Sequence, residues 1–210
     1  MIRIATSGSI TTLTLDRPDK ANALTEAMLT DLIAAVIAAK DAAALILTGT
    51  GKVFSAGADL DAARAGLATS PLWEELSGAI DAHDGLTIAA LNGTVAGGAN
   101  GMVLACDLRI AVPGAKFFYP VMKLGYLPQP SDPVRMAALI GPSRTKWMLL
   151  AGQKIETDDA LGWGLIDEIV PANELLERAH ALCDDCTGAD PATARAIKRL
   201  CNGTERPDKH

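Results

Sequence analysis

The sequence predicts an α/β fold whose sheet is largely parallel. Short, continuous apolar runs bounded by glycine, such as "AALILTG" and "LTIAAL", are typical of strands buried on both faces. Segments with helical periodicity alternate with these runs, which is the order expected for parallel strands joined by helices. At 210 residues the chain is long enough to bury a substantial core.

The N-terminal part is predicted to be a hairpin followed by a helix. Strands are expected over 2–5 and 12–15, around the turn residues Ser7 to Ser9, and a polar loop then covers 16–24. Thr25 is a good N-cap, and the helix after it should end near Lys40. Its apolar residues follow helical spacing and are expected on the inner face: Met28, Leu29, Leu32, Ile33, Val36 and Ile37.

The middle of the chain is predicted to alternate strands and helices. A loop is expected over 49–59, and it enters a helix at about Asp59. Ser70 and Pro71 are typical of a helix start, and that helix should reach about His83. The other predicted elements are strands over 43–49, 86–91, 108–111 and 116–118, and a helix over 98–105.

The C-terminal part is predicted to be mainly helical. Ser131 should cap a helix that ends at Ile140 and Gly141, and a second helix should start at Pro142. A short helix capped by Thr157, a strand near 169 and helices over 173–183 and 191–200 follow, before an irregular tail. We expect an α/β core over residues 1–170 and a helical segment over 171–210.

Composition excludes several classes of function. A net charge of −6 argues against a sequence-independent nucleic-acid binder, which would need a basic face. No run of 18 apolar residues occurs that could span a membrane. The N-terminus lacks the layout of a signal peptide, so we expect a cytoplasmic protein without nucleic-acid or membrane partners. Cys183 and Cys186 form an isolated CxxC, which we interpret as reduced helix cysteines rather than a zinc site.

Two glycine-rich turns are the candidate functional feature. "FSAGADL" (54–60) and "NGTVAGGANGMVLACDLRIA" (92–111) each lead from an apolar run toward a helix. Glycine lets backbone N–H groups approach a ligand closely, and a helix start adds unpaired N–H groups. Two such turns facing each other would bind a developing negative charge. Alternatively, the small residues only permit close packing.

Five ordered motifs resemble the crotonase (enoyl-CoA hydratase/isomerase) superfamily. They are "LDRPDKANAL", "ILTGTGKVFSAGADL", "AALNGTVAGGANGMVLACDLRIA", "FFYPVMKLGYLP" and "TDDALGWGLIDEIVP", and the resemblance runs from about Ile10 to Leu200. It implies a crotonase-like spiral of ββα units assembled as trimers or hexamers. The chain stops where most relatives continue into further helices, so the helical segment is expected to be shortened.

The resemblance also implies a ligand and a site. The family stabilises an enolate made from a coenzyme A thioester, and the two backbone N–H donors for the thioester oxygen look like those of Ala58 and Gly98. Coenzyme A is then part of the substrate, and no separate cofactor or metal is implied. Further expected contacts with the acyl-CoA are Lys20, Ala21, Ala56, Asp59, Leu60 and Asn100, although Lys20 alternatively is a solvated loop lysine and Asn100 a helix surface residue.

Both glutamates of the family's hydratases are missing. Their positions are Gly101 and Val121, the latter expected on a strand after Pro120, and neither residue can move a proton. Candidate substitutes are Tyr119 and Asp132, with Gln129 able to orient a water or carboxylate. The plainer interpretations, which we favour, are that Tyr119 is a half-buried strand tyrosine and Asp132 part of a helix cap.

Three functions remain open. The first is a reaction needing little acid/base help, such as decarboxylation of a malonyl-type thioester. The second is isomerase or hydratase chemistry with substitute groups. The third is non-catalytic acyl-CoA binding. Asp61 occupies a position that is often lysine in the family, which suggests altered ligand binding.

Overall fold

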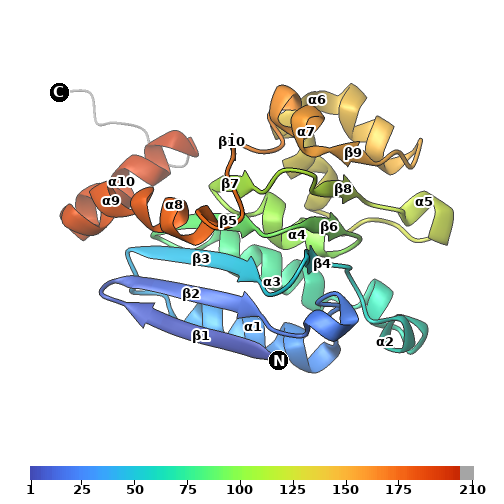
Figure 1. Cartoon of the computed structure of the whole chain (residues 1–210), viewed down its shortest axis with the longest axis horizontal. Helices are drawn as coiled ribbons and strands as arrows, with labels where there is room; N and C mark the ends of the chain where they lie inside the picture. The colour runs from blue at the N-terminus through green and yellow to red at the C-terminus, as the bar shows by residue number, and fades with distance from the viewer. Residues whose placement is uncertain (204–210) are drawn as a thin grey trace.

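Two β-sheets form the centre of the molecule in the computed structural model, which describes residues 1–203 (Figure 1). The larger sheet has the order β1-β2-β3-β5-β7-β10, and only the β1–β2 hairpin is antiparallel. Its strands are β1 Ile2–Ser7, β2 Ile10–Leu15, β3 Ala44–Gly49, β5 Leu86–Leu91, β7 Leu108–Ala111 and β10 Glu168–Ile169.

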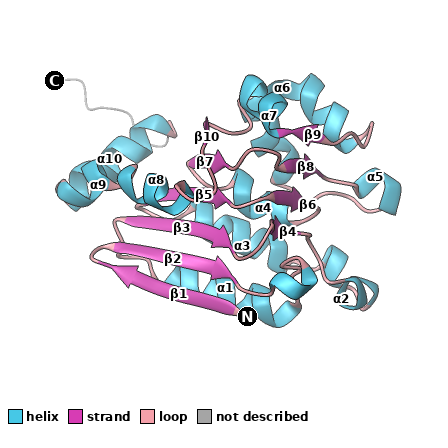
Figure 2. Cartoon of the chain, in the orientation of Figure 1, coloured by secondary structure: helices cyan, strands magenta, loops and turns pink. Residues whose placement is uncertain are grey.

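The smaller sheet consists of short strands in the order β4-β6-β8-β9 (Figure 2). Its strands are β4 Val53–Ser55, β6 Thr94–Ala96, β8 Lys116–Phe118 and β9 Ile155–Glu156. The prediction of a loop over 49–59 missed β4, and β6 was likewise not predicted. Three-residue strands have no measurable periodicity, and they exist here because β4 pairs with β6 and β6 with β8.

Within residues 1–203, one ββα unit that contributes a strand to each sheet occurs three times in succession. Each unit has a strand in the larger sheet, a strand in the smaller sheet and a short helix. The units are β3-β4-α2, β5-β6-α4 and β7-β8-α5, with α2 at Leu60–Arg64, α4 at Ala99–Leu104 and α5 at Val121–Leu124. This arrangement confirms the predicted α/β spiral.

Longer helices cover the larger sheet. Behind this sheet in Figure 1, α1 (Glu26–Ala38) packs against α3 (Leu72–Asp81), and α3 packs against α4. In front of the sheet, α8 (Leu175–Ala181) lies against β5 and β7. The Thr25 hydroxyl caps α1 by accepting from the Met28 N–H, as predicted. The predicted inner face is also correct except for Ile37, which is exposed at the end of the helix.

The remaining α-helices of the described residues belong to the C-terminal part of the chain. They are α6 Asp132–Leu149, α7 Thr157–Trp163, α9 Asp184–Gly188 and α10 Pro191–Cys201. Gly141 interrupts α6 with a φ of 79°, which confirms the predicted break. The Thr157 hydroxyl donates to the carbonyls of Val112 and Ala115, so Thr157 does not cap α7 as expected.

The C-terminal part of the chain was predicted to form a separate helical segment. The predicted division of the chain at residue 170 stays a prediction. Residues 204–210 of the expected irregular tail lie outside the described residues. None of the helices within residues 1–203 is both long and apolar enough to cross a membrane.

Candidate active site

The two glycine-rich turns lie against each other. Gly57 and Gly97 both adopt left-handed conformations, with φ of 86° and 57°. A Cβ atom on Gly57 would lie 2.8 Å from the carbonyl oxygen of Ala96 and 3.4 Å from the Cα of Gly97. Glycine is therefore required at 57 both for its backbone angle and for the close approach of the second turn.

The residue after each of these glycines has an unpaired backbone N–H. The Leu24 N–H donates to the Gly57 carbonyl at 2.7 Å, and the Asp59 N–H donates to the Leu24 carbonyl at 2.8 Å. Because successive N–H groups of an extended segment point to opposite sides, the Ala58 N–H points away from Leu24. Within residues 1–203, neither this N–H nor that of Gly98 donates to a protein acceptor.

An ion pair anchors the first turn. Arg17 Nη1 donates to Oδ2 of Asp59 at 2.8 Å and to the Ala23 carbonyl at 2.9 Å. The Arg17 hydrogen bond is the main reason that the pKa of Asp59 is lowered. The other oxygen, Oδ1, accepts the N–H groups of Asp61 and Ala62 at the start of α2. Asp59 therefore ties the turn to both the early loop and the helix that follows.

The second turn is supported by Asn100 and Trp73. Asn100 is buried, and its Nδ2 donates to the carbonyls of Gly97 and Phe118 at 2.8 and 3.1 Å. The alternative of a helix surface residue is therefore wrong for Asn100. The Trp73 ring lies against Gly98, where an added Cβ would be 3.0 Å from ring carbons. Its indole N–H is held by the Leu67 carbonyl at 2.7 Å.

The Asp132 carboxyl group occupies the space in front of Gly101. A Cβ atom on Gly101 would lie 2.9 Å from Oδ1 and 3.2 Å from Oδ2 of Asp132. Gly98 and Gly101 are three residues apart at the start of α4, so they share a helix face. An aspartate from α6 therefore lies where the side chain of a residue at position 101 would project.

Tyr119 holds this carboxyl group. Its hydroxyl donates to Oδ2 of Asp132 at 2.9 Å, and both side chains are buried. Within the described residues, Oδ1 of Asp132 has no hydrogen-bond partner. Two favoured interpretations are therefore wrong. Tyr119 follows β8 and is almost fully buried, and the Asp132 carboxylate bonds to Tyr119 rather than capping the helix.

The environment raises the pKa of Asp132 to about 6. Burial is the largest cause and disfavours the ionised form. The Tyr119 hydrogen bond and the positive charge of Arg135 lower this pKa, whereas the negative charge of Glu74 raises it. The pKa of Tyr119 is raised as well, chiefly by burial and then by the Asp132 charge. Asp132 is the group that can exchange a proton near neutral pH.

Val121 and Gln129 lie on the segment between Tyr119 and Asp132. Val121 is buried, and it is the first residue of α5 rather than part of a strand as predicted. Pro120 lacks an N–H and so cannot extend the ladder of β8. Gln129 contributes backbone groups: its carbonyl accepts from the Asp132 N–H, and its N–H hydrogen-bonds the Tyr119 hydroxyl.

The residues expected to contact coenzyme A gather beside the first turn. The Ala56 N–H donates to the Ala21 carbonyl at 3.0 Å, which joins the early loop to the segment before Gly57. Lys20, Ala56 and Leu60 are exposed there, Leu60 by 75%. Their contact with a ligand stays a prediction.

Sequence reasoning missed the role of α3 beside the site. Glu74 accepts hydrogen bonds from both the N–H and the hydroxyl of Ser131, the residue before Asp132. No spacing in the sequence indicates these contacts, because 57 residues separate Glu74 from Ser131.

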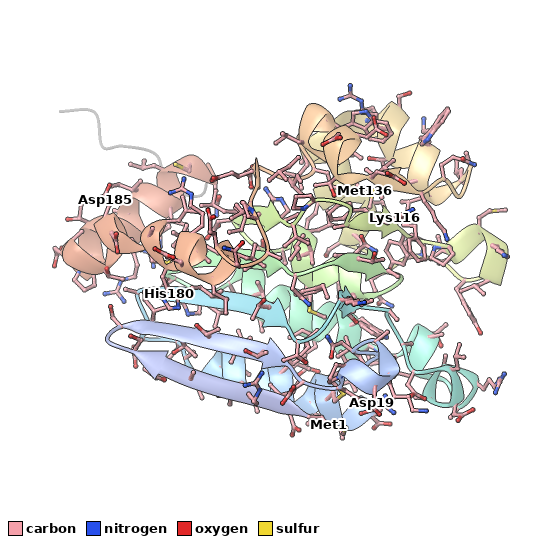
Figure 3. All side chains as sticks on the ribbon, in the orientation of Figure 1. Met1, Asp19, Lys116, Met136, His180 and Asp185 are labelled. Carbon is pink, nitrogen blue, oxygen red and sulfur yellow. The ribbon has the colours of Figure 1, made fainter. Side chains whose placement is uncertain are left out.

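His83 and the two cysteines of the CxxC make local contacts in the fold. His83 is buried between the Gly85 N–H and the Ala39 carbonyl. Cys183 and Cys186 are free thiols, as expected. No group of three or more potential metal ligands occurs within residues 1–203. Figure 3 shows Met136 on α6; it lies one turn after Asp132 and is fully buried, so this face of α6 points inward.

Comparison with known proteins gives consistent matches. The family model described as "Enoyl-CoA hydratase/isomerase" matches residues 5–209. Carnitinyl-CoA dehydratase from Salmonella typhi is 32% identical over 97% of this chain and 80% of its own length. The structure is similar to that of enoyl-CoA hydratase from Bacillus anthracis, with a TM-score of 0.89, 29% identity and coverage of 97% of this chain and 83% of that one. It is also similar to DspI from Pseudomonas aeruginosa, with a TM-score of 0.88, 30% identity and coverage of 98% and 88%.

Proposed function

Because the chain belongs to the enoyl-CoA hydratase/isomerase family, we propose that it is an isomerase-type enzyme acting on an acyl-CoA thioester. Asp132 removes a proton from the acyl chain and returns it at a different carbon. The observation that carries the proposal is the position of Asp132, whose unpartnered Oδ1 lies in front of Gly101, one helical turn from Gly98.

The free N–H groups of Ala58 and Gly98 support the first half of the reaction. When a proton leaves the α-carbon, its bonding electrons move to the thioester oxygen, which becomes an enolate. Donors that are fixed beforehand stabilise this charge more than the neutral thioester. Each such donor is typically worth roughly 3–4 kcal/mol. The contact between the two glycine turns supports a shared site for that oxygen.

Asp132 supports the proton transfer. With a pKa of about 6, the carboxyl group is mostly ionised at pH 7 and can accept a proton, yet it is basic enough to hold the proton briefly. Tyr119 keeps Oδ2 engaged, so Oδ1 is the atom available to the substrate. For a 3-enoyl thioester, removal of the α-proton and return to the γ-carbon gives the conjugated 2-enoyl isomer, with no net gain or loss of atoms.

Standard hydration with two glutamates is disfavoured by the residues present. Gly101 and Val121 stand at the positions of both carboxylates, and the proposal rests on the carboxyl group of Asp132, which lies in front of Gly101. One group can shuttle a proton between two carbons, whereas adding water needs one group to activate the water and another to protonate carbon.

The test uses 3-enoyl-CoA thioesters in deuterated water. We expect the wild type to exchange α-protons and to produce the 2-enoyl isomer. Asp132→Asn should slow both by about 100- to 10,000-fold, the usual contribution of a general base. Tyr119→Phe should cause a smaller loss, and Asp158→Asn, an exposed aspartate in the first turn of α7, serves as the matched control.

Other outcomes would favour the alternatives. Release of carbon dioxide from malonyl-type thioesters, unaffected by Asp132→Asn, would show a decarboxylase that needs only the two N–H donors. Acyl-CoA binding in calorimetry with neither exchange nor turnover would show a non-catalytic binding protein. A protein that binds no thioester would contradict all three functions.

The proposal includes assembly and coenzyme A contacts. We propose that Lys20 lies near the phosphates of coenzyme A and that the backbone at 56–60 lies near its adenine. Coenzyme A is part of the substrate, and we propose no separate cofactor and a cytoplasmic location.

We further propose a homotrimer or hexamer, which light scattering would test. Its support is an apolar groove on α5 and α6 with exposed apolar side chains beside it: Met122, Leu124, Leu127, Trp147 and Leu150.

A further inference from the structure

A polar seam joins α3 to α6 and begins next to Asp132. Glu74, Ser77 and Asp81 follow one stripe of α3, at spacings of three and four residues. Ser131 and Arg135 are four residues apart at the start of α6. The two stripes meet through hydrogen bonds and an ion pair, so they fix the α6 start against α3.

The contacts at the first position of the seam are the most directed. The N–H of Ser131 donates to Oε2 of Glu74 at 3.3 Å, and the Ser131 hydroxyl donates to Oε1. Both oxygens of the Glu74 carboxylate are thus used by the residue directly before Asp132. Further along, Arg135 donates to the Ser77 hydroxyl at 3.0 Å and lies 3.4 Å from Oδ2 of Asp81.

We infer that Glu74 is a positioning residue for Asp132: by binding Ser131, its carboxylate holds the start of α6 so that the Asp132 carboxyl group faces Gly101. The effect of this positioning on catalysis rests on the isomerase function proposed above. The segment over 121–131 contains one short helix and connects Tyr119 to Asp132 without a strand. The contact with Glu74 therefore ties its last residue to the rigid part of the molecule.

The negative charge of Glu74 also affects the pKa of Asp132. The charged groups that act on Asp132 are Glu74 from α3, which raises its pKa, and Arg135 from α6, which lowers it. Tyr119 donates to it, and the uncharged Gly101 of α4 lies at the carboxyl group. Asp81 is paired with Arg135. Glu74 is the negative charge that offsets Arg135 at this carboxyl group.

Neutralising Glu74 separates its charge from its contact. Glu74→Gln keeps an oxygen that can accept from Ser131 but removes the charge, so the pKa of Asp132 should fall. Glu75→Gln is the matched control, because Glu75 belongs to the same first turn of α3 but is exposed. The measurement is a carbon-13 titration of the Asp132 carboxyl group by NMR in the ligand-free protein. In Glu74→Ala, which removes both the charge and the contact, an Asp132 carboxyl signal with the chemical shift and pKa of the wild type would overturn the inference.

Removing the contact should affect kcat more than KM. In Glu74→Ala, Asp132 is no longer held, and kcat for α-proton exchange should fall roughly tenfold or more while KM changes little. In Glu74→Gln the acidic limb of the pH profile should move to lower pH with kcat largely kept, which a purely structural role would not produce. Full kcat in Glu74→Ala would contradict the positioning role.

The two proposals fail in different ways. If the wild type exchanges no α-protons, the proposed isomerase function is wrong, yet the NMR titration still decides whether Glu74 acts on Asp132. If the wild type exchanges protons and Asp132→Asn does not, but Glu74→Ala keeps full kcat and an unchanged Asp132 carboxyl signal, only the inference about Glu74 is wrong.

Discussion

The Tyr119 hydroxyl donates to Oδ2 of Asp132 at 2.9 Å, and both side chains are buried. This bond links the residue after β8 to the first residue of α6. It uses one carboxylate oxygen and leaves Oδ1, in front of Gly101, without a partner in the described chain. A buried carboxyl group that is only half satisfied reduces stability, and its retention is expected where the group has a chemical role.

The raised pKa of Asp132 predicts how stability changes with pH. Its pKa is about 6 in the folded protein and about 3.8 in the unfolded chain, so the folded state binds this proton more tightly. Stability therefore falls as the pH rises through the interval from about 4 to 6, by about 3 kcal/mol in all. Asp132→Asn cannot ionise and should escape this loss.

Urea unfolding of the wild type and Asp132→Asn at pH 4 and pH 7.5 would measure the effect. The variant should gain about 3 kcal/mol relative to the wild type between the two pH values. A difference between the two proteins that does not depend on pH would contradict a buried, destabilised carboxylate at position 132.

The space in front of Gly101 predicts the effect of a methyl group there. In Gly101→Ala the Cβ would lie 2.9 Å from Oδ1 of Asp132, so the carboxyl group must shift. We expect a loss of roughly 1–3 kcal/mol in the free energy of unfolding, as for other overpacked sites, and a large loss of exchange activity.

Gly162→Ala is the matched control for this substitution. Gly162 also lies inside a helix, but a Cβ there would meet nothing within 4 Å. Alanine should then stabilise α7 by up to about 1 kcal/mol through its helix propensity. Equal effects at 101 and 162 in urea unfolding would contradict the contact with Asp132.

The Arg17–Asp59 pair predicts a role in holding the Ala58 turn. Asp59→Asn removes the charge that binds Arg17, so the turn carrying the Ala58 N–H should loosen and kcat/KM for exchange should fall. Asp158→Asn is the control, because Asp158 is exposed in the first turn of α7, away from this turn. Because its folded pKa is lowered, ionised Asp59 contributes stability above about pH 4, and this contribution is lost as the pH falls. Equal activity of the two variants would argue against this anchor.

Lys198 predicts how α10 is attached. Its Nζ donates to the carbonyls of His83 and Gly85, each at 2.8 Å, and to Oδ2 of Asp107 at 2.7 Å. The pair is mostly buried, so Lys198→Met should lower the free energy of unfolding by about 3 kcal/mol. Hydrogen exchange should show that α10 loses protection first.

Lys116→Met provides the comparison. Lys116 pairs with Glu156 at 3.0 Å, but both side chains are half exposed or more, and such pairs are worth about 0–1 kcal/mol. If both substitutions cost the same, or if α10 keeps its protection in Lys198→Met, Lys198 is not the anchor of that helix.

The sequence by itself determined the elements whose signals are local. Continuous apolar runs predicted β3 and β5, because both faces of a central parallel strand are buried and no alternation is needed. Thr25 predicted the start of α1, and Gly141 predicted the break in α6, because capping and left-handed turns depend on a few neighbouring residues. The two glycine turns were likewise visible before the structure.

Only the tertiary structure decided which groups lie in front of Gly101. Asp132 reaches Gly101, and Glu74 reaches Ser131, across contacts between helices that are distant in the sequence. The burial of Tyr119 follows from the same packing, and so do β4 and β6, which are too short to show a period. Sequence patterns report the side of an element that faces the core, whereas the partner on that side is set by how separate elements pack.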